Sequence, residues 1–207
     1  MKPKLIILAL IAFTAHAFSQ SKNTISFVYG TTSNDVNIHG AIGDFGYTGK
    51  GGSQFGLNYT HNFNHTFSLQ SGIMFSNDNV QLNTLGPQYN GLFYTGNINQ
   101  TGNIKLITIP VIAKVSFLKY LYVDAGLLAD FETNYSSDGT DQANKTATKQ
   151  TGIGIELGLG ANYNFGRWDI FVNPFTQVHA IARFSSGNTS NFNLLDAGFK
   201  FGAGYSF

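Results

Sequence analysis

Hydrophobic residues recur at every second position along most of the chain after residue 20. Successive side chains of a β-strand point to opposite faces, so a period of two predicts strands, whereas a helix shows a period of about 3.6. No sustained helical period occurs after residue 20. The most regular alternation predicts strands at 55–59, 67–75, 107–115, 121–129, 153–163 and 195–207.

Two less regular segments raise the expected number of strands to eight. One lies near 24–31 and the other near 168–183, where Phe175 falls on the otherwise polar face. Pro174 in this segment and Pro110 in an earlier one each lack the N–H group that a strand ladder needs. The two prolines therefore predict a bulge or a local irregularity in their strands.

The connections between these strands alternate strictly in length. Short turns are expected around 62–64, 117–119 and 164–167, and long polar loops at about 32–51, 77–103, 132–149 and 185–192. This alternation puts all short turns at one end of a barrel and all long loops at the other, as in barrels of the bacterial outer membrane. The sequence therefore predicts an all-β protein, an eight-stranded antiparallel up-and-down transmembrane β-barrel with short periplasmic turns and long extracellular loops.

The segments 79–85 and 92–98 are the candidates for two additional strands. Each is shorter than the roughly 9–11 residues that a membrane-spanning strand needs, so a ten-stranded barrel is not expected. They predict instead a hairpin that projects from the third and fourth strands beyond the membrane. Eight strands leave an interior that side chains fill, which argues against a conducting pore.

Alternation alone does not decide which face of the strands points outward. A soluble secreted barrel of the lipocalin type would also alternate, with its apolar side chains inside. The polar face here consists mostly of Gly, Ser, Thr, Asn and Gln, whereas a water-exposed face is usually rich in Lys and Glu. We therefore expect the apolar face to contact lipid and the small polar side chains to line a narrow lumen.

A few charged residues share the parity of the small polar ones. Three are positive and three are negative, so they can neutralise one another, and burying an unpaired charge is costly. The sequence therefore predicts a charge network in the lumen, formed by Lys114, Asp124, Glu156, Arg183, Asp196 and Lys200.

Aromatic residues gather near the short turns and near the end of the last strand. An interfacial girdle of a membrane barrel belongs at such a rim. The residues concerned are Phe63, Phe67, Phe117, Tyr120, Tyr163, Phe165, Trp168, Tyr205 and Phe207.

The beginning of the chain has the three-part pattern of a secretory signal peptide. Two lysines precede the apolar run 5–13, and Ala15-His16-Ala17 fits the small-x-small cleavage pattern. The run is much shorter than the ~20 residues that a membrane-spanning helix needs. We expect a signal peptide at 1–20, cleaved near 17–20, and a barrel domain at 21–207.

Composition excludes several classes of function. Twelve Lys and Arg residues stand against eleven Asp and Glu, a formal charge of +1, so there is no basic field to attract nucleic acid. The chain has no Cys. Disulfides, a thiolate nucleophile and a Cys-ligated zinc site are therefore excluded.

Three segments resemble the PorT-like outer-membrane β-barrel family, which is common in Bacteroidetes. The segment 107–114 is similar to that family's Leu-Glu-Ile-Pro-Leu-Leu-x-Lys strand, 124–126 to the strand after it, and 152–163 to its Gly-x-x-x-Gly-x-Gly strand. The resemblance covers about 24–207. Thr108 stands where the family often has an acidic residue, so an internal Glu–Lys pair at that place is not carried over.

The last strand looks like the C-terminal strand that outer-membrane barrels present to their insertion machinery. It ends in Gly-Ala-Gly-Tyr-Ser-Phe, with alternating aromatic residues. The resemblance implies that Phe201, Tyr205 and Phe207 form the insertion signal.

The histidines provide the best candidates for a catalytic or metal site. His61 and His65 flank a short turn, but a closed metal site would need a third or fourth ligand. His39 lies near Asp35 and Asp44 in a predicted loop, where a simple loop contact is expected. We expect no metal and no cofactor.

A hydrolase that acts on lipid A or phospholipid is the enzymatic alternative. His179 with Ser185 or Ser186 would serve as base and nucleophile, and Glu156 or Asp196 would orient the base. No Gly-x-Ser-x-Gly elbow supports this arrangement, and His179 has the inward parity of the lumen residues. We therefore expect a protein that is not an enzyme.

The sequence leads to an expected location in the outer membrane of a Gram-negative cell envelope. The leading hypothesis is a small integral barrel with a structural role, or with an interaction or adhesion role carried by its long loops. The family resemblance suggests an alternative, an accessory role in protein secretion or envelope assembly. The expected partners are outer-membrane lipid, the barrel insertion machinery and an envelope or surface protein, but no nucleic acid.

Overall fold

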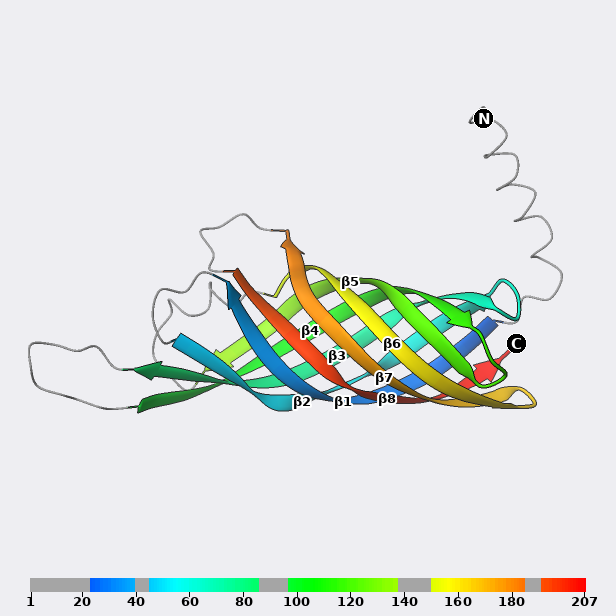
Figure 1. The fold of residues 1–207 in the computed structure, drawn as a ribbon, viewed down its shortest axis with the longest axis horizontal. Coiled ribbons are helices and arrows are strands. Elements are labelled where there is room, and N and C mark those ends of the chain that lie inside the picture. The colour runs from blue at the N-terminus through cyan, green and yellow to red at the C-terminus, as the bar shows by residue number, and fades with distance from the viewer. Residues whose placement is uncertain (1–22, 40–44, 86–96, 138–149, 185–190) are drawn as a thin grey trace, which may run out of the picture.

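The computed structural model describes residues 23–39, 45–85, 97–137, 150–184 and 191–207. They form eight strands in sequence order (Figure 1). The strands are β1 (Asn23–His39), β2 (Phe45–Asn62), β3 (Phe67–Leu85), β4 (Asn97–Ser116), β5 (Leu121–Ser137), β6 (Gly152–Phe165), β7 (Trp168–Arg183) and β8 (Asn191–Ser206). Within these ranges no helix is long and apolar enough to cross a membrane. The predicted signal peptide lies outside them.

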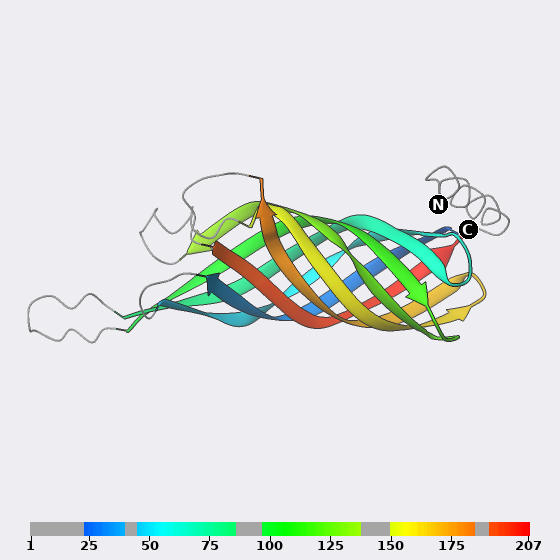
Figure 2. The ribbon, with the colours of Figure 1, turned by 45° about the horizontal axis from the view of Figure 1, so that its top comes forward.

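The strands close into a single antiparallel barrel. Each strand pairs with its neighbours in sequence, and β1 also pairs with β8, from Thr24 opposite Ser206 to His39 opposite Asn191. Figures 1 and 2 show the tilted strands wrapping around one long axis. Closure gives the backbone groups of the barrel wall partners on both sides, which a sheet in hydrocarbon requires. The predicted eight-stranded antiparallel fold is confirmed.

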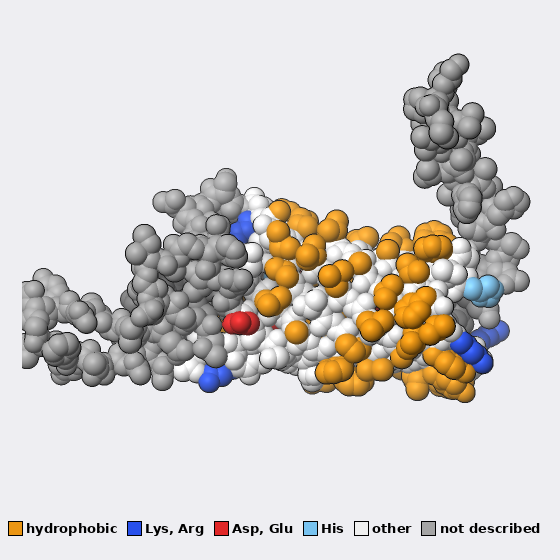
Figure 3. All heavy atoms as spheres, in the orientation of Figure 1, with side chains coloured by type: hydrophobic (Ala, Val, Ile, Leu, Met, Phe, Trp, Pro, Cys, Tyr) orange, Lys and Arg blue, Asp and Glu red, His pale blue; other side chains and the backbone are white. Residues whose placement is uncertain are grey.

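The apolar face of the strands lies on the outside of the barrel. Four residues from four strands decide the orientation: Leu57 is 59% exposed, Ile109 40%, Leu157 54% and Phe201 50%. Hydrophobic side chains cover the barrel wall in Figure 3, and the charged ones lie towards its two ends. A soluble barrel with a dry apolar centre is therefore excluded, and the predicted orientation is confirmed.

Several strands run farther than hydrophobic alternation predicts. The expected loop 32–51 is mostly strand, because β1 continues to His39 and β2 begins at Phe45. The expected loops 77–103 and 132–149 are shortened in the same way by β3, β4 and β5. These outer segments contain few apolar residues, so no alternation marks them, and pairing with neighbouring strands determines their conformation.

A projecting hairpin is present, but its second arm is 97–103, whereas the sequence placed that arm at 92–98, of which 92–96 lie outside the described residues. β3 and β4 remain paired from Asp78 opposite Ile104 to Leu85 opposite Asn97, beyond the last large lipid-facing side chain of β3, Phe75. Figure 1 shows the two strands extending past the rest of the barrel. We call the paired segments 79–85 and 97–103 the outer hairpin.

The two prolines interrupt strand pairing without changing its register. The β3–β4 ladder skips the positions around Pro110, and the β6–β7 ladder skips those around Pro174, but the residues on either side keep the same alignment. The predicted local irregularity is therefore present, but the alternative expectation, a bulge at the prolines, is wrong. Register shifts occur elsewhere, among them one beside Ala180, whose φ is +50°.

The rim with the short turns carries the predicted aromatic residues at its surface. The ring of Trp168 meets that of Tyr205 edge to face with centroids 5.2 Å apart, and the centroids of Tyr120 and Tyr163 are 5.8 Å apart. Amphipathic rings at this position suit the boundary between hydrocarbon and water. This end of the barrel is therefore the periplasmic one in a barrel with long outer loops.

Candidate functional site

The interior of the barrel is the only part of the described chain where polar and charged side chains are concentrated out of contact with water. Every second residue of each strand points inward, because the strand period is two. Apolar side chains such as Leu106, Ile112, Leu128 and Leu194 fill part of the same space. The interior is therefore a packed polar and apolar core.

The periplasmic half of this interior contains Lys114 on β4. Its Nζ donates a hydrogen bond to Gln70 Oε1 at 3.3 Å and lies 4.2 Å from the ring centroid of Tyr122 and 5.3 Å from that of Phe171. Aromatic faces carry partial negative charge and stabilise an ammonium group. Asp124, which pairs with Lys114 in the β4–β5 register, accepts a hydrogen bond from the Asn173 side chain.

A buried ion pair occupies the middle of the barrel. Lys200 Nζ on β8 is 2.5 Å from Glu156 Oε1 on β6, and the second carboxylate oxygen accepts a hydrogen bond from Gln177 Nε2 at 2.6 Å. Lys200 Nζ also lies 4.4 Å from the ring centroid of Phe175, the aromatic residue that the sequence placed on the polar face. The ion pair thus links β6 and β8, and β7 between them supplies Gln177 and Phe175.

A histidine between carboxylates occupies the outer half of the interior. His179 Nδ1 is 3.0 Å from Asp130 Oδ2, and Nε2 is 3.2 Å from Asp196 Oδ2. Asp130 also accepts a hydrogen bond from the Thr108 hydroxyl at 2.8 Å. Facing carboxylates at both ring nitrogens suit an imidazolium, because only the protonated ring carries an N–H at each of them.

Asp78 adds a third carboxylate to this region. It is fully buried and accepts a hydrogen bond from the Thr32 hydroxyl at 3.1 Å, and its charge interacts with those of Asp196 and His179. We call Asp78, Asp130, His179 and Asp196 the outer polar cluster. Its members come from β3, β5, β7 and β8, so it links opposite sides of the barrel.

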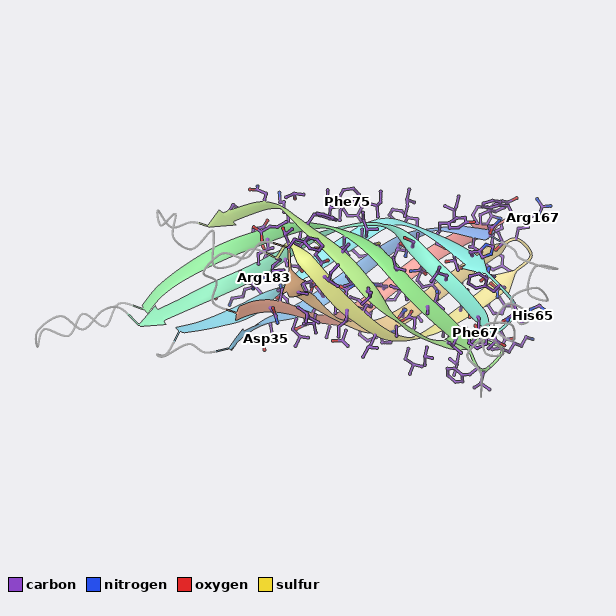
Figure 4. The ribbon with its side chains drawn as sticks, turned by 90° about the horizontal axis from the view of Figure 1, so that it is seen from above. Asp35, His65, Phe67, Phe75, Arg167 and Arg183 are labelled. Carbon is purple, nitrogen blue, oxygen red and sulfur yellow. The ribbon has the colours of Figure 1, made fainter. Side chains whose placement is uncertain are left out.

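The six residues predicted for the lumen network occupy four different places. Lys200 and Glu156 form the central pair, Lys114 and Asp124 lie nearer the periplasmic end, and Asp196 belongs to the outer polar cluster. Arg183 is half-buried at the outer end of β7, opposite Gly152, and interacts electrostatically with Glu132. Figure 4 shows Arg183 and Asp35 towards this outer end.

The sequence interpretation missed two acidic members of the outer polar cluster. Asp130 lies on the polar side of the alternation in β5, as Asp124 does, but the predicted network did not include it. Asp78 lies in a segment that was expected to be a loop, where parity could not be assigned. His179 was given the right parity, but the sequence did not show which carboxylates surround it.

The hydrolase arrangement is not supported by the position of its base. His179 is only 2% exposed, and both its ring nitrogens face carboxylates, which leaves none for a serine hydroxyl. Asp196 does contact the ring as that hypothesis required, but Glu156 contacts Lys200 instead. Ser185 and Ser186 lie outside the described residues.

The other histidines have simple surroundings. His61 Nδ1 lies 2.8 Å from Asn23 Oδ1, and its ring packs edge to face on Phe63. His65 lies in the exposed turn after β2, and the side chain of His39 is outside the described part. No group of three or more His, Asp or Glu residues among those described could hold a metal ion.

The last strand presents the predicted aromatic residues outward. Phe201, Tyr205 and Phe207 are all exposed on the lipid side of the barrel. The backbone N–H of Phe207 donates to the carbonyl of Asn23 at 2.8 Å, and the N–H of Asn23 donates to the carbonyl of Phe207 at 3.0 Å. The end of β8 therefore closes the barrel and displays an aromatic row at the same time.

Replacing Thr108 with valine should lower the free energy of unfolding by about 1–2 kcal/mol, because Asp130 would lose a buried hydrogen bond. The measurement is urea unfolding in lipid vesicles. Thr176→Val on the exposed face of β7 is the matched control, and its effect should stay within roughly 0.5 kcal/mol. Equal effects of the two substitutions would contradict the role assigned to the hydroxyl of Thr108.

Comparison with known proteins places this geometry in a family. A family model described as outer membrane protein beta-barrel domain matches residues 18–207. No curated protein matches the sequence.

Several solved outer-membrane proteins are similar to the chain over most of its length. Ail, the attachment invasion locus protein of Yersinia pestis, is 15% identical over 90% of this chain and 99% of its own, with a TM-score of 0.43. OprG from Pseudomonas aeruginosa is 16% identical over 90% of this chain and 96% of its own, with a TM-score of 0.49. Outer membrane protein W of E. coli is 16% identical over 88% and 97%, with a TM-score of 0.38. A shared fold at these identities does not fix a function.

Proposed function

Because the chain belongs to the outer membrane protein β-barrel family and is a bacterial outer-membrane protein, we propose that it is a closed, non-conducting scaffold. Its outer strands bind a protein partner of the envelope or cell surface. The observation that carries the proposal is the combination of a packed interior with a long paired hairpin outside the lipid-facing belt.

The packed interior supports a scaffold and argues against a pore. Side chains from different walls meet at several levels, such as Lys200 with Glu156 and His179 with Asp130. Near the outer end, the side chain of Gln150 accepts a hydrogen bond from the backbone N–H of Leu194 at 3.2 Å. An eight-stranded barrel has just enough interior for such side chains, and water-filled channels need more strands.

The outer hairpin supports binding by the extracellular end. β5 pairs with β4 from Gly102 onwards. On the same edge of β4, Asn97–Thr101 have no partner strand among the described residues. Unpaired backbone groups at a strand edge can bind an extended segment of another chain. Exposed polar segments on a rigid barrel are also where recognition usually resides.

Removing the tip of the outer hairpin should abolish partner binding and leave the barrel intact. The variant replaces 82–100 with Asn-Gly, which suits a tight turn between Gln81 and Thr101, a cross-strand pair, and it keeps the buried Val80. The measurement is the amount of envelope or surface protein cross-linked to the barrel in intact cells. Heat-modifiable migration on gels is the folding control, and unchanged cross-linking by a folded deletion variant would refute the proposal.

The likeness to the PorT-like family remains a narrower hypothesis. It depends on the strand sequences 107–114, 124–126 and 152–163, which form parts of β4, β5 and β6. An accessory role in secretion or envelope assembly follows from that resemblance alone. It would require that cells without the protein lose secretion or envelope integrity.

A further inference from the structure

The barrel interior opens at the periplasmic end into a cavity of about 1060 Å³, which we call the vestibule. Its walls consist largely of amide and hydroxyl side chains, among them Asn62, Ser68, Asn162 and Asn164. Figure 4 shows His65, which lines the cavity, at this end of the barrel. The volume is similar to that of sites that hold small ligands, roughly 300–1,000 Å³.

The vestibule contains a positive charge that has no carboxylate in direct contact. Two lysines line the cavity, the exposed Lys119 and the half-buried Lys114, and the ion pairs formed by the described residues include neither. The one hydrogen-bond acceptor of Lys114 is Gln70, whereas Lys200 deeper in the barrel is paired with Glu156. An ammonium group has three donors, so Lys114 retains the capacity to bind a ligand oxygen.

A negative charge lines another wall of the same cavity. Asp169 on β7 lies beside Ser26 of β1 and Gly204 of β8. The carboxylate is so close to Gly204 that a Cβ atom at that position would overlap it. Its Oδ1 is buried and has no hydrogen-bond partner among the described residues. The charges of Asp169 and Lys114 attract each other, yet the two side chains form no ion pair.

A cavity with separated charges of opposite sign is complementary to a molecule that carries both charges. We propose that the vestibule binds small zwitterions such as short peptides, with the ligand carboxylate on Lys114 and the ligand ammonium on Asp169. The amide and hydroxyl side chains of the wall supply hydrogen bonds for the peptide groups. This site lies at the opposite end of the barrel from the outer hairpin, so it is independent of the function proposed above.

The test uses the dipeptide dialanine and three blocked forms of it. Chemical-shift changes of the Gly166 and Asn164 amides, which belong to vestibule residues, report binding to the barrel in detergent micelles. N-acetylation removes the ammonium group of the ligand, and amidation removes its carboxylate. Each should weaken binding roughly tenfold, because one charged hydrogen bond is lost each time.

Two variants assign the charges to their partners. In Lys114→Met, dialanine and its amide should bind equally, and in Asp169→Asn, dialanine and its N-acetyl form should bind equally. Lys105→Met, at an exposed outer position of β4, is the control and should keep both differences. Heat-modifiable migration shows whether each variant folds.

Ligand binding by the wild-type protein tests the proposal even if a variant fails to fold. Equal binding of dialanine and its doubly blocked form would overturn the proposal, and so would absence of binding by dialanine. A loss on amidation but not on acetylation would show a site for anions alone and would also overturn it.

Discussion

Replacing Lys200 with methionine should lower the free energy of unfolding by about 3–5 kcal/mol, since Glu156 would remain buried without its cation. Lys200 is 6% exposed and Glu156 2%, so water cannot replace the lost partner. Gln177 would still donate to the carboxylate, but one hydrogen bond from a neutral amide does not compensate for the ammonium group. The measurement is urea unfolding of the protein inserted in lipid vesicles.

A double substitution distinguishes a broken ion pair from a packing defect. Lys200→Met combined with Glu156→Gln removes both charges and keeps the side-chain volumes similar, so it should recover most of the lost stability. Lys105→Met, far from the pair and exposed, should have little effect. If the double variant is as unstable as Lys200→Met, the ion pair is not the source of the loss.

Replacing Leu157 with arginine should lower the free energy of unfolding in a bilayer by about 2–4 kcal/mol, the cost of a charged side chain on the lipid face near the midplane. Leu157 is 54% exposed, and it lies between the lipid-facing Ile155 and Leu159 on β6. Hydrocarbon cannot hydrate a guanidinium group, whereas water would. The comparison therefore tests which solvent surrounds the barrel.

The matched control places the same residue outside the apolar belt. Thr101 is exposed on β4 in the outer hairpin, opposite Gln81 and beyond the lipid-facing Phe75, and Thr101→Arg should cost about 0–1 kcal/mol because the side chain remains in water. Folding is followed by heat-modifiable migration and urea unfolding in vesicles of defined thickness. Equal costs at the two positions would contradict the assigned membrane belt.

The boundary between strand and loop at the outer end is the least predictable part of the fold. β1 reaches His39 and β3 reaches Leu85, although the alternation stops near the end of the apolar belt. Hydrophobic alternation reports contact with lipid, and the outer parts of these strands have no such contact. Their pairing depends on neighbouring strands, which no local pattern reveals.

The sequence by itself determined the number of strands, their antiparallel order and the side that meets lipid. Local residue order shows the period of two, the alternation of short and long connections and the polar face that is poor in charge. It does so because each strand contacts the hydrocarbon with its own outward side chains. Only the tertiary structure decided which inward residues meet. His179 contacts Asp130 and Asp196 from two other strands, and Lys200 forms an ion pair with Glu156. Barrel closure and strand register bring these residues, distant in the sequence, to the same level along the barrel axis.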